Sequence, residues 1–251
     1  MLAANARMYS VTPAVKAAWQ ELFAWVARTS GVPLSYLDHA APAPLEDLWA
    51  REDLGAAFMC GFPFASAEVK PQPLAAPVPS PPRYGGRSQY CTDFVVRADS
   101  AFKTLSDTFG SRIGWTVEHS QSGYRAVRHH LAALPAAHYA EWIGPLVTPR
   151  RVIDALLAGE IEVGPLDSYV HDLVRRHEPA TAAQLRVVGE TAMTPIPLLV
   201  ASTGVPDEAA ARLRDALLAC HRADELAAAR DTLLLARFAA VDAAGYDGLA
   251  R

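Results

Sequence analysis

The first 64 residues alternate between strand-like and helix-like segments, and this order restricts the fold more than any other feature of the chain. The strand-like runs are 2–10, 33–38 and 56–64. The helix-like runs between them are 14–29 and 44–51. Thr12 and Pro13 precede the first helix-like run and Gly31 follows it, as is typical of a helix N-cap, first turn and stop. A β-α-β-α-β order favours a parallel sheet with helices on its faces.

The next part of the chain changes composition. Prolines crowd residues 71–87, which we expect to be an extended or loop segment that crosses into another lobe. A second α/β set follows, returning through strand-like runs at 185–188 and 196–201. From residue 206 onward we expect mostly helix, over 207–222 and 224–240. The predicted organisation is lobe 1, residues 1–88 plus 189–251, and lobe 2, residues 89–188.

Composition excludes several classes of protein. Hydrophobic residues make up 51% and charged residues 20% of the 251 residues, which indicates a globular chain rather than a disordered one. The net charge of -4 and the scattered basic residues argue against a nucleic-acid surface. No export signal and no apolar run of about 18 residues is apparent. The expected location is cytoplasmic as the sequence stands, or periplasmic if an export signal was trimmed.

Cysteine and histidine offer little chemistry at the level of sequence. Three widely spaced cysteines, Cys60, Cys91 and Cys220, make neither a disulfide framework nor a CxxC metal site. We expect Cys220 to be a buried thiol, and Cys60 is better explained as a structural residue than as a nucleophile. His119 and Ser120 are neighbours, and sequence neighbours rarely form a nucleophile and base pair. We therefore predict no catalytic residues and no metal site.

One stretch, Thr116 to Tyr124, has the residues of an anion site. It lies between a strand-like run, 111–117, and a helix-like run, 122–134. The first N–H groups of a helix have no partner inside it, and the helix dipole adds partial positive charge there. Serine hydroxyls add donors, and glycine permits close approach of a ligand. The alternative is that a serine only caps the helix, which alone would be the commoner explanation.

Small, polar or aromatic residues also follow other predicted strands. The four strand ends of this kind are Met8-Tyr9-Ser10, Cys60-Gly61-Phe62-Pro63, His119-Ser120-Gln121-Ser122-Gly123-Tyr124 and Gly164-Pro165-Leu166-Asp167-Ser168-Tyr169. In open parallel sheets, ligands bind outside the carboxyl ends of the strands. The pattern predicts a ligand site built from several strand ends.

With these segments in order, the chain resembles the phosphate/phosphite/phosphonate-type substrate-binding proteins of ABC transporters, which have the type 2 periplasmic-binding-protein fold. Six segments carry the resemblance, over about residues 3 to 205: Met8-Tyr9, Met59 to Pro63, Tyr90-Cys91 leading into Phe94 to Arg97, Ser120 to Tyr124, Gly159 to Asp167, and Thr194 to Pro197. The resemblance implies an α/β fold of two lobes that close on a small ligand.

The resemblance also implies which residues face the ligand. Ser120, Ser122, Gly123 and Tyr124 correspond to the anion-holding helix N-terminus of the family. The full predicted set of ligand-binding residues is Tyr9, Cys60, Gly61, Phe62, Tyr90, His119, Ser120, Gln121, Ser122, Gly123, Tyr124 and Asp167. For Asp167, a helix cap is an equally good explanation.

Departures from the family pattern narrow the expected ligand. A Gly-Ser-His segment of phosphonate-binding members is replaced here by Leu146 to Arg151, and Glu118 adds negative charge beside the proposed anion site. Aromatic residues are frequent at the strand ends, although Trp115, inside a predicted strand, is expected to belong to the core. We therefore expect a small anion or a flat polar or aromatic molecule rather than a phosphonate dianion.

Two other functions are considered. Enzymes of thiamin-pyrimidine synthesis resemble this fold and use a pyridoxal phosphate lysine, but Lys16, Lys70 and Lys103 do not fall at predicted strand ends. A cytosolic sensor domain is the other alternative. The preferred prediction is a binding protein with no cofactor, a small-molecule ligand, an ABC permease as possible partner, no nucleic acid, no membrane span, and a monomeric or weakly dimeric state.

Overall fold

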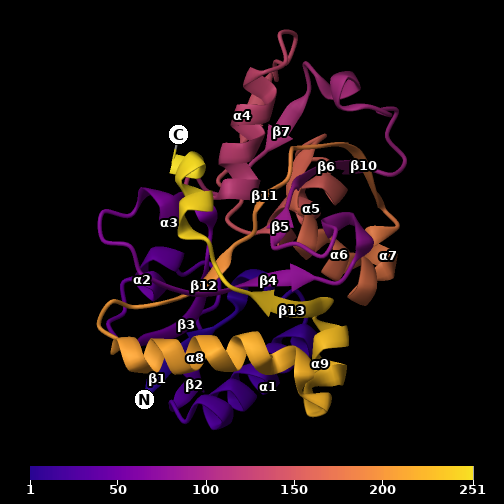
Figure 1. Ribbon diagram of the computed structural model, residues 1–251. Helices are drawn as coiled ribbons and strands as arrows, with labels where there is room; N and C mark the ends of the chain where they lie inside the picture. Colours follow the sequence, from indigo (N-terminus) through magenta and orange to yellow (C-terminus); the bar gives the residue numbers. More distant parts are fainter. Residues whose placement is uncertain (251) are drawn as a thin grey trace. The chain divides into compact units, whose positions relative to one another are not determined.

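The computed structural model describes residues 1–250, and the chain forms two compact units (Figure 1). The first unit comprises residues 1–89 and the chain from residue 195 onward, and the second comprises residues 90–194. Two short strands at the crossings, β5 (Gln89–Tyr90) and β11 (Thr194–Pro195), pair with each other. Both units combine helices and strands, which confirms the predicted α/β class.

The first unit is built on a six-stranded sheet in the order β13-β4-β12-β3-β1-β2. Its strands are β1 (Leu2–Asn5), β2 (Leu34–Tyr36), β3 (Leu54–Met59), β4 (Gln72–Pro79), β12 (Leu198–Ala201) and β13 (Leu235–Ala239). Its helices are α1 (Pro13–Ser30), α2 (Leu45–Trp49), α3 (Gly61–Ser66), α8 (Asp207–Ala219) and α9 (Ala227–Thr232), with 3-10 turns η1 (Arg7–Tyr9), η2 (Pro82–Tyr84), η5 (Cys220–Arg222), η6 (Asp224–Leu226) and η7 (Ala243–Ala250).

The predicted parallel arrangement is confirmed for the first three strands. β1 pairs in parallel with both β2 and β3, whereas β12 pairs antiparallel with β3 and β4, and β13 pairs antiparallel with β4. Helix α1 begins after Thr12, whose side chain accepts a hydrogen bond from the Val15 N–H, and ends before Gly31 in the left-handed conformation. α1 and α8 pack against each other (Figure 1).

Three predictions about the first unit are wrong in part. The segment 60–64 was expected to continue a strand, but β3 ends at Met59 and α3 begins at Gly61. Short apolar runs do not distinguish a strand from a buried helix. The segment 71–87 was expected to cross between lobes, but it contains β4, a strand inside the sheet. The segment 224–240 was expected to be helical throughout, but residues 235–239 form β13.

The second unit holds a three-stranded antiparallel sheet in the order β10-β6-β9, and a parallel pair, β7 and β8. Its strands are β6 (Thr92–Arg97), β7 (Arg112–Gly114), β8 (Glu141–Ile143), β9 (Gly164–Asp167) and β10 (Leu185–Glu190). Its helices are α4 (Ala126–Ala132), α5 (Pro149–Leu157), α6 (Ser168–His177) and α7 (Pro179–Ala182), with a 3-10 turn η3 (Leu105–Thr108) and a π-helical turn η4 (Gln121–Arg125).

The sequence also predicts Thr148 as the cap of a helix that begins at Pro149, and both this cap and the cap at Asp167 are confirmed. Thr148 accepts a hydrogen bond from the Arg151 N–H at the start of α5, and Asp167 accepts bonds from the N–H groups of Tyr169 and Val170 at the start of α6. The core beneath these elements packs side chains of β6, β7 and α4 against one another; it contains Phe94, Val96, Leu105, Ile113, Val127, Leu131 and Val163.

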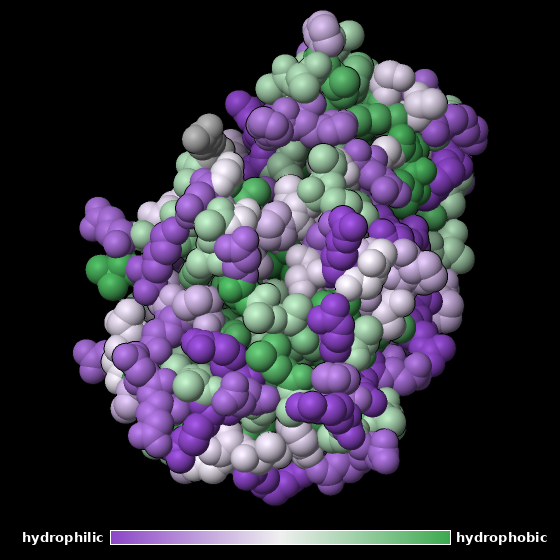
Figure 2. Space-filling view, viewed as in Figure 1, coloured by the Kyte–Doolittle hydropathy of each residue, from purple (hydrophilic) through white to green (hydrophobic). Residues whose placement is uncertain are grey.

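Hydrophilic and hydrophobic residues are interspersed on the visible face of the molecule (Figure 2). Among residues 1–250, no helix combines the length and the apolar character that crossing a membrane requires. Cys60, Cys91 and Cys220 are all buried, and burial raises the pKa of the Cys220 thiol to about 11. The prediction of a buried thiol at Cys220 is therefore confirmed.

Candidate ligand site in the second unit

The segment between β7 and α4 turns sharply after the strand. β7 ends at Gly114, earlier than predicted, because the Thr116 N–H donates to the Gly123 carbonyl (3.2 Å) instead of a neighbouring strand. Ser120 is the N-cap of η4, and its Oγ accepts from the Gly123 N–H at 3.0 Å. η4 continues directly into α4, so the helix starts with one π turn. Such turns are frequent at functional sites.

Gly123 is the point of closest approach in this turn. A Cβ at this residue would lie 1.9 Å from Thr116 Oγ1 and 2.9 Å from Ser120 Oγ. Any larger side chain would push the threonine out of its place, since Cβ contacts under 3.0 Å do not occur in relaxed structures. Glycine is therefore required here by the hydroxyls that surround it.

Two buried polar atoms in this segment have no hydrogen-bond partner within the described protein. They are Thr116 Oγ1 and Gln121 Oε1, in residues whose exposed fractions are 4% and 5%. Buried polar side-chain atoms are nearly always hydrogen-bonded, because leaving one unpaired costs about 1–3 kcal/mol. A bound ligand that supplies the missing partners would remove this cost.

Other elements of the second unit fix the position of this turn. Thr92 Oγ1 on β6 donates to the Ser122 carbonyl at 2.9 Å. Next to Thr92, Cys91 exchanges two hydrogen bonds with Ser168, at the start of α6. The Asp167 carboxylate is engaged by the backbone N–H groups of α6, which accounts for an aspartate at this position. The starts of η4 and α6 are thus both joined to β6.

Aromatic rings and two arginines flank the start of the helix. The Tyr124 ring lies 5.2 Å from that of Trp115 and 6.3 Å from that of Trp142. The Arg128 guanidinium lies over the Trp142 ring at 5.1 Å, and Arg125 donates to the Glu118 carbonyl at 2.8 Å. Trp115 is half-buried and lies just past β7, so the prediction that it belongs to the core inside a strand is wrong.

The structure brings together part of the predicted ligand-binding set. His119, Ser120, Gln121, Ser122, Gly123 and Tyr124 share one turn, with Asp167 at the neighbouring start of α6 and Tyr90 buried beside β6. Thr92, Thr116, Arg125, Arg128 and Trp142 are additional polar or aromatic residues of this region that the predicted set lacks. Arg128 could have been found from its i+4 helical spacing to Tyr124, whereas Trp142 depends on the pairing of β7 with β8.

The remaining predicted residues belong to the first unit. Tyr9 is fully buried, with its ring 4.8 Å from Phe58 in an edge-on arrangement. Cys60 and Gly61 are buried, and Phe62 is half-buried, at the junction of β3 and α3. Because β1 and β3 are parallel neighbours, Tyr9 and this junction follow the same edge of the sheet.

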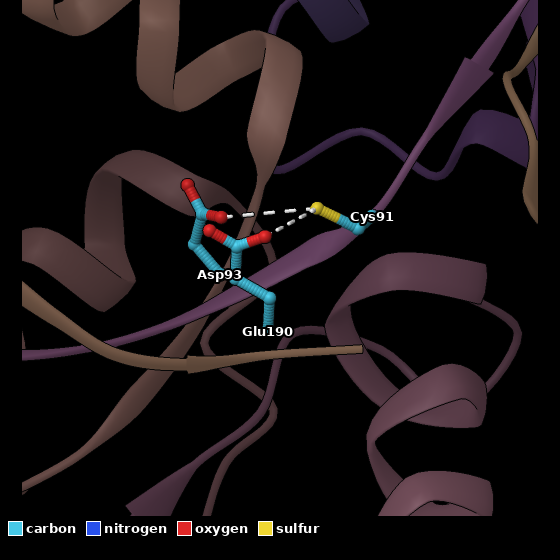
Figure 3. A group of neighbouring side chains, drawn as sticks. All are labelled: Cys91, Asp93 and Glu190. Carbon is cyan, nitrogen blue, oxygen red and sulfur yellow. Dashed lines mark hydrogen bonds between the residues drawn. The ribbon is translucent and has the colours of Figure 1, made fainter. Parts of the chain in front are cut away.

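A separate group in the second unit has the chemistry of a cation site. Figure 3 shows Cys91, which directly precedes β6, and Asp93 of β6 beside Glu190 of β10; the Cys91 thiol lies 3.9 Å from a carboxylate oxygen of each. One atom from each residue lies within 4.8 Å of the other two. Asp93 is fully buried, and its second oxygen lies 2.7 Å from His171 Nδ1. A sulfur and two carboxylates suit a borderline-soft divalent ion.

The comparisons with known proteins agree with this fold. The model of the family described as "ABC transporter, phosphonate, periplasmic substrate-binding protein" matches residues 10–246. The chain belongs to this family. It is thus a solute-binding protein of the phosphonate-type ABC transporter family, whose members are transporter components rather than enzymes. The search of curated proteins gave no match.

Solved structures with the same fold are distant in sequence. A binding protein of an ABC phosphonate transporter from Pseudomonas aeruginosa is 16% identical, with a TM-score of 0.75, over 96% of this chain and 82% of that one. PhnD1 from Prochlorococcus marinus, in complex with methylphosphonate, is 14% identical, with a TM-score of 0.77, over 99% and 95%. A Xanthomonas citri protein bound to ATP is 20% identical, with a TM-score of 0.64, over 99% and 97%.

Proposed function

We propose that this binding protein takes a small oxyacid as its monoanion, and that the turn from Thr116 to Tyr124 holds it. The observation that carries the proposal is the pair of unpaired buried atoms, Thr116 Oγ1 and Gln121 Oε1. The threonine hydroxyl can donate a hydrogen bond, whereas an amide oxygen can only accept one. A ligand that carries both a donor for Gln121 Oε1 and an acceptor for the Thr116 hydroxyl would pair both atoms.

The charge state of the ligand follows from this requirement. A dianionic phosphonate or phosphate carries acceptors alone at its anionic end, so Gln121 Oε1 would stay unpaired beside it. A monoanion that keeps one protonated oxygen supplies the O–H that this atom lacks. Glu118, which is exposed two residues before the cap, also favours the smaller negative charge.

The surroundings support an anion that carries a small organic group. The helix that starts at Gln121 runs to Ala132, so its dipole and first N–H groups favour negative charge at its start. Arg125 and Arg128 add positive charge on the same helix. The half-buried rings of Trp115, Tyr124 and Trp142 favour an apolar substituent next to the anion.

Calorimetric titration with methyl phosphate at two pH values tests the proposal. A phosphate monoester has a second pKa of about 6, so it is a monoanion at about pH 5 and a dianion at about pH 8. We expect tighter binding at the lower pH, and replacement of Gln121 by Leu should abolish that preference. Gln184→Leu is the matched control, since Gln184 is exposed and bonded to the Ala180 carbonyl of its own segment. Tighter binding at the higher pH, or no binding at either, contradicts the proposal.

Membership of the family extends the proposal to the setting of the protein. We propose that it delivers its ligand to an ABC permease from the periplasm, and that Tyr9, Cys60, Gly61, Phe62, Tyr90 and Asp167 contribute to the ligand site. The alternative, an enzyme with a pyridoxal phosphate lysine, would have to use Lys16, Lys70 or Lys103. Lys16 and Lys70 form surface ion pairs with Asp38 and Asp247, which does not favour that alternative. Fractionation of cells that express the native gene tests the location, and a cytoplasmic result contradicts it.

A further inference from the structure

The sheet of the second unit brings one thiol and two carboxylates together on one of its faces. Cys91 directly precedes β6 and Asp93 lies in it, so these side chains, two residues apart in extended chain, point to the same face. Glu190, at the end of β10, is paired directly opposite Asp93. The ligand-type atoms of the three residues lie within 4.8 Å of one another, and Figure 3 shows the thiol directed toward both carboxylates. The register of the sheet therefore sets the spacing of the group.

The two carboxylates are unfavourably placed for each other. Acidic residues directly opposite each other on neighbouring strands destabilise a sheet, because their like charges repel. Asp93 is fully buried, where water screens its charge little. His171 of α6 holds Asp93 Oδ2 with its Nδ1 at 2.7 Å, whereas Oδ1 is the oxygen that faces the Cys91 sulfur. A divalent cation bound by both carboxylates would turn this repulsion into attraction.

Hydrogen bonding of the thiol does not account for both of its contacts. Cys91 Sγ lies 3.9 Å from Asp93 Oδ1 and 3.9 Å from Glu190 Oε2, but a thiol has one proton and donates to one carboxylate at a time. In a tetrahedral zinc site, with Zn–S of about 2.3 Å and Zn–O of about 2.0 Å, sulfur and oxygen lie roughly 3.5 Å apart. Both distances exceed that separation by only about 0.4 Å, so small side-chain rotations suffice to close on an ion.

Backbone contacts hold the strand ends that carry the group. The Cys91 N–H donates to Ser168 Oγ at 3.1 Å, and the Cys91 carbonyl accepts from the Ser168 N–H at 3.0 Å. Thr191, next to Glu190, makes the equivalent pair of bonds with Thr92: its Oγ1 accepts at 2.9 Å and its N–H donates at 3.0 Å. Ligand positions on strands fixed in this way are more precise than positions on loops.

We propose that Cys91, Asp93 and Glu190 bind a divalent cation such as Zn²⁺. Zn²⁺ accepts thiolate and carboxylate ligands together, whereas Mg²⁺ and Ca²⁺ take oxygen ligands. The ion replaces the thiol proton, because the thiolate is the form that ligates a metal. Glu190 is exposed and gives the ion a path from solvent, and a water molecule completes four ligands.

The cation site lies on the other face of β6 from the turn between Thr116 and Tyr124. Thr92 stands between the two ligand residues at the start of β6, so its side chain points to the opposite face. There its Oγ1 donates to the Ser122 carbonyl of the turn at 2.9 Å. The cation is therefore bound separately from any molecule that the turn holds.

Calorimetric titration of the full chain with Zn²⁺ tests the site. We expect one Zn²⁺ per chain, bound at least about tenfold more weakly by Glu190→Gln, since even loss of a partner behind a metal ligand costs about 10–100-fold in affinity. Glu190 is exposed, so this variant keeps the fold. Glu141→Gln, which changes an exposed glutamate on β8 of the same unit, is the control and should bind as the wild type. Absence of Zn²⁺ binding, or equal affinity of Glu190→Gln and the wild type, overturns the proposal.

Titration with Co²⁺ identifies the thiolate. A cobalt ion bound to a thiolate gives a charge-transfer absorption in the near ultraviolet, which we expect in the wild type. Cys91→Ala should lose this absorption and Cys220→Ala, which removes another buried thiol, should keep it. No absorption in the wild type, or the same absorption in Cys91→Ala, overturns the proposal, and Glu190→Gln decides if Cys91→Ala fails to fold. Methyl phosphate is absent from both titrations, so their outcome is independent of the ligand proposed for the turn.

Discussion

Each unit has a junction where a strand leads into a helix through a glycine with no room for a side chain. In the first unit, the space beside Gly61 is filled by Leu249 and Tyr246. In the second, the space beside Gly123 is filled by the hydroxyls of Thr116 and Ser120. One junction is closed by apolar atoms of the chain's own end, and the other is lined by polar atoms, one of which lacks a partner. The space beside the glycine is thus filled by apolar atoms in the first unit and by polar atoms in the second.

Loss of the Tyr9 ring should show that the edge of the first unit carries stability. Tyr9 is fully buried against Phe58, so Tyr9→Ala should lower the free energy of unfolding by about 3–5 kcal/mol, as for other large aromatic truncations. Urea denaturation measures this change. A loss below about 1 kcal/mol would mean that Tyr9 is not a packing residue. It would then contradict the statement that apolar packing distinguishes this edge of the first unit from the turn in the second.

A methyl group added at Gly123 should disturb the other junction. Gly123→Ala places its Cβ against Thr116 Oγ1, and such overpacking typically costs about 1–3 kcal/mol. Methyl phosphate affinity should fall together with stability. The double variant with Thr116→Ala removes the shortest contact, although the Cβ of residue 116 and Ser120 Oγ stay at 2.9 Å, so it should recover part of the stability but not the affinity. Recovery of both would exclude Thr116 from ligand contact.

Replacement of Gln121 by Leu should separate binding from stability. Because Gln121 Oε1 is buried without a partner, its removal leaves the free energy of unfolding unchanged or raises it, while affinity should fall about tenfold, or 1.4 kcal/mol. Thermal denaturation and calorimetry on the same samples measure both quantities. Lower stability with unchanged affinity would mean that Gln121 stabilises the fold and does not contact the ligand.

Ser122→Ala should have a smaller effect. Ser122 is 8% exposed and its carbonyl already accepts a bond from Thr92, so the substitution removes only the hydroxyl. A single neutral hydrogen bond contributes about 0.5–1.5 kcal/mol, which corresponds to a loss of affinity between about twofold and tenfold. Unchanged affinity would remove the start of the helix from the ligand site.

The smallest effect is expected from a pair that supports the second unit away from the turn. The Arg112 guanidinium, opposed by partial burial, holds the pKa of Glu162 below its usual value, and the Arg112 N–H also donates to it at 2.8 Å. A carboxylate with a lowered folded pKa stabilises the fold above its unfolded pKa of about 4.3 and loses this contribution as pH falls.

The melting temperatures of the wild type and Glu162→Gln should therefore converge as the pH is lowered from about 6 to about 3. Methyl phosphate affinity at about pH 6 should be the same for both proteins. A difference in melting temperature that stays constant with pH would show that Glu162 acts by packing and not by its charge.

Local signals explain what could be predicted from the sequence. The starts of α1, α5 and α6 were found because Thr12, Thr148 and Asp167 satisfy N–H groups within the next three residues. The helix start at Ser120 was found for the same reason. The family resemblance is confirmed by the match of the family model to residues 10–246, whereas the register of the individual segments stays a prediction.

What was missed depends on contacts between distant residues. Residues 235–239 have the composition of a helix but pair with β4, since pairing across a sheet overrides local propensity. Trp142 is placed beside Tyr124 by the pairing of β8 with β7. Which buried atoms remain unpaired, as at Thr116 and Gln121, depends on every neighbour and is not encoded in any local pattern.

The proline-rich strand β4 has a consequence for the chain before it is folded. It lies between β12 and β13, which follow it in the chain by about 120 residues or more. During synthesis, β4 is therefore exposed before the two strands that pair with it have been made. Pro73, Pro77 and Pro79 lack the N–H that cross-chain pairing would use, and the irregular register with both neighbours accommodates them in the finished sheet. We therefore expect these prolines to limit pairing of this segment with other chains during synthesis.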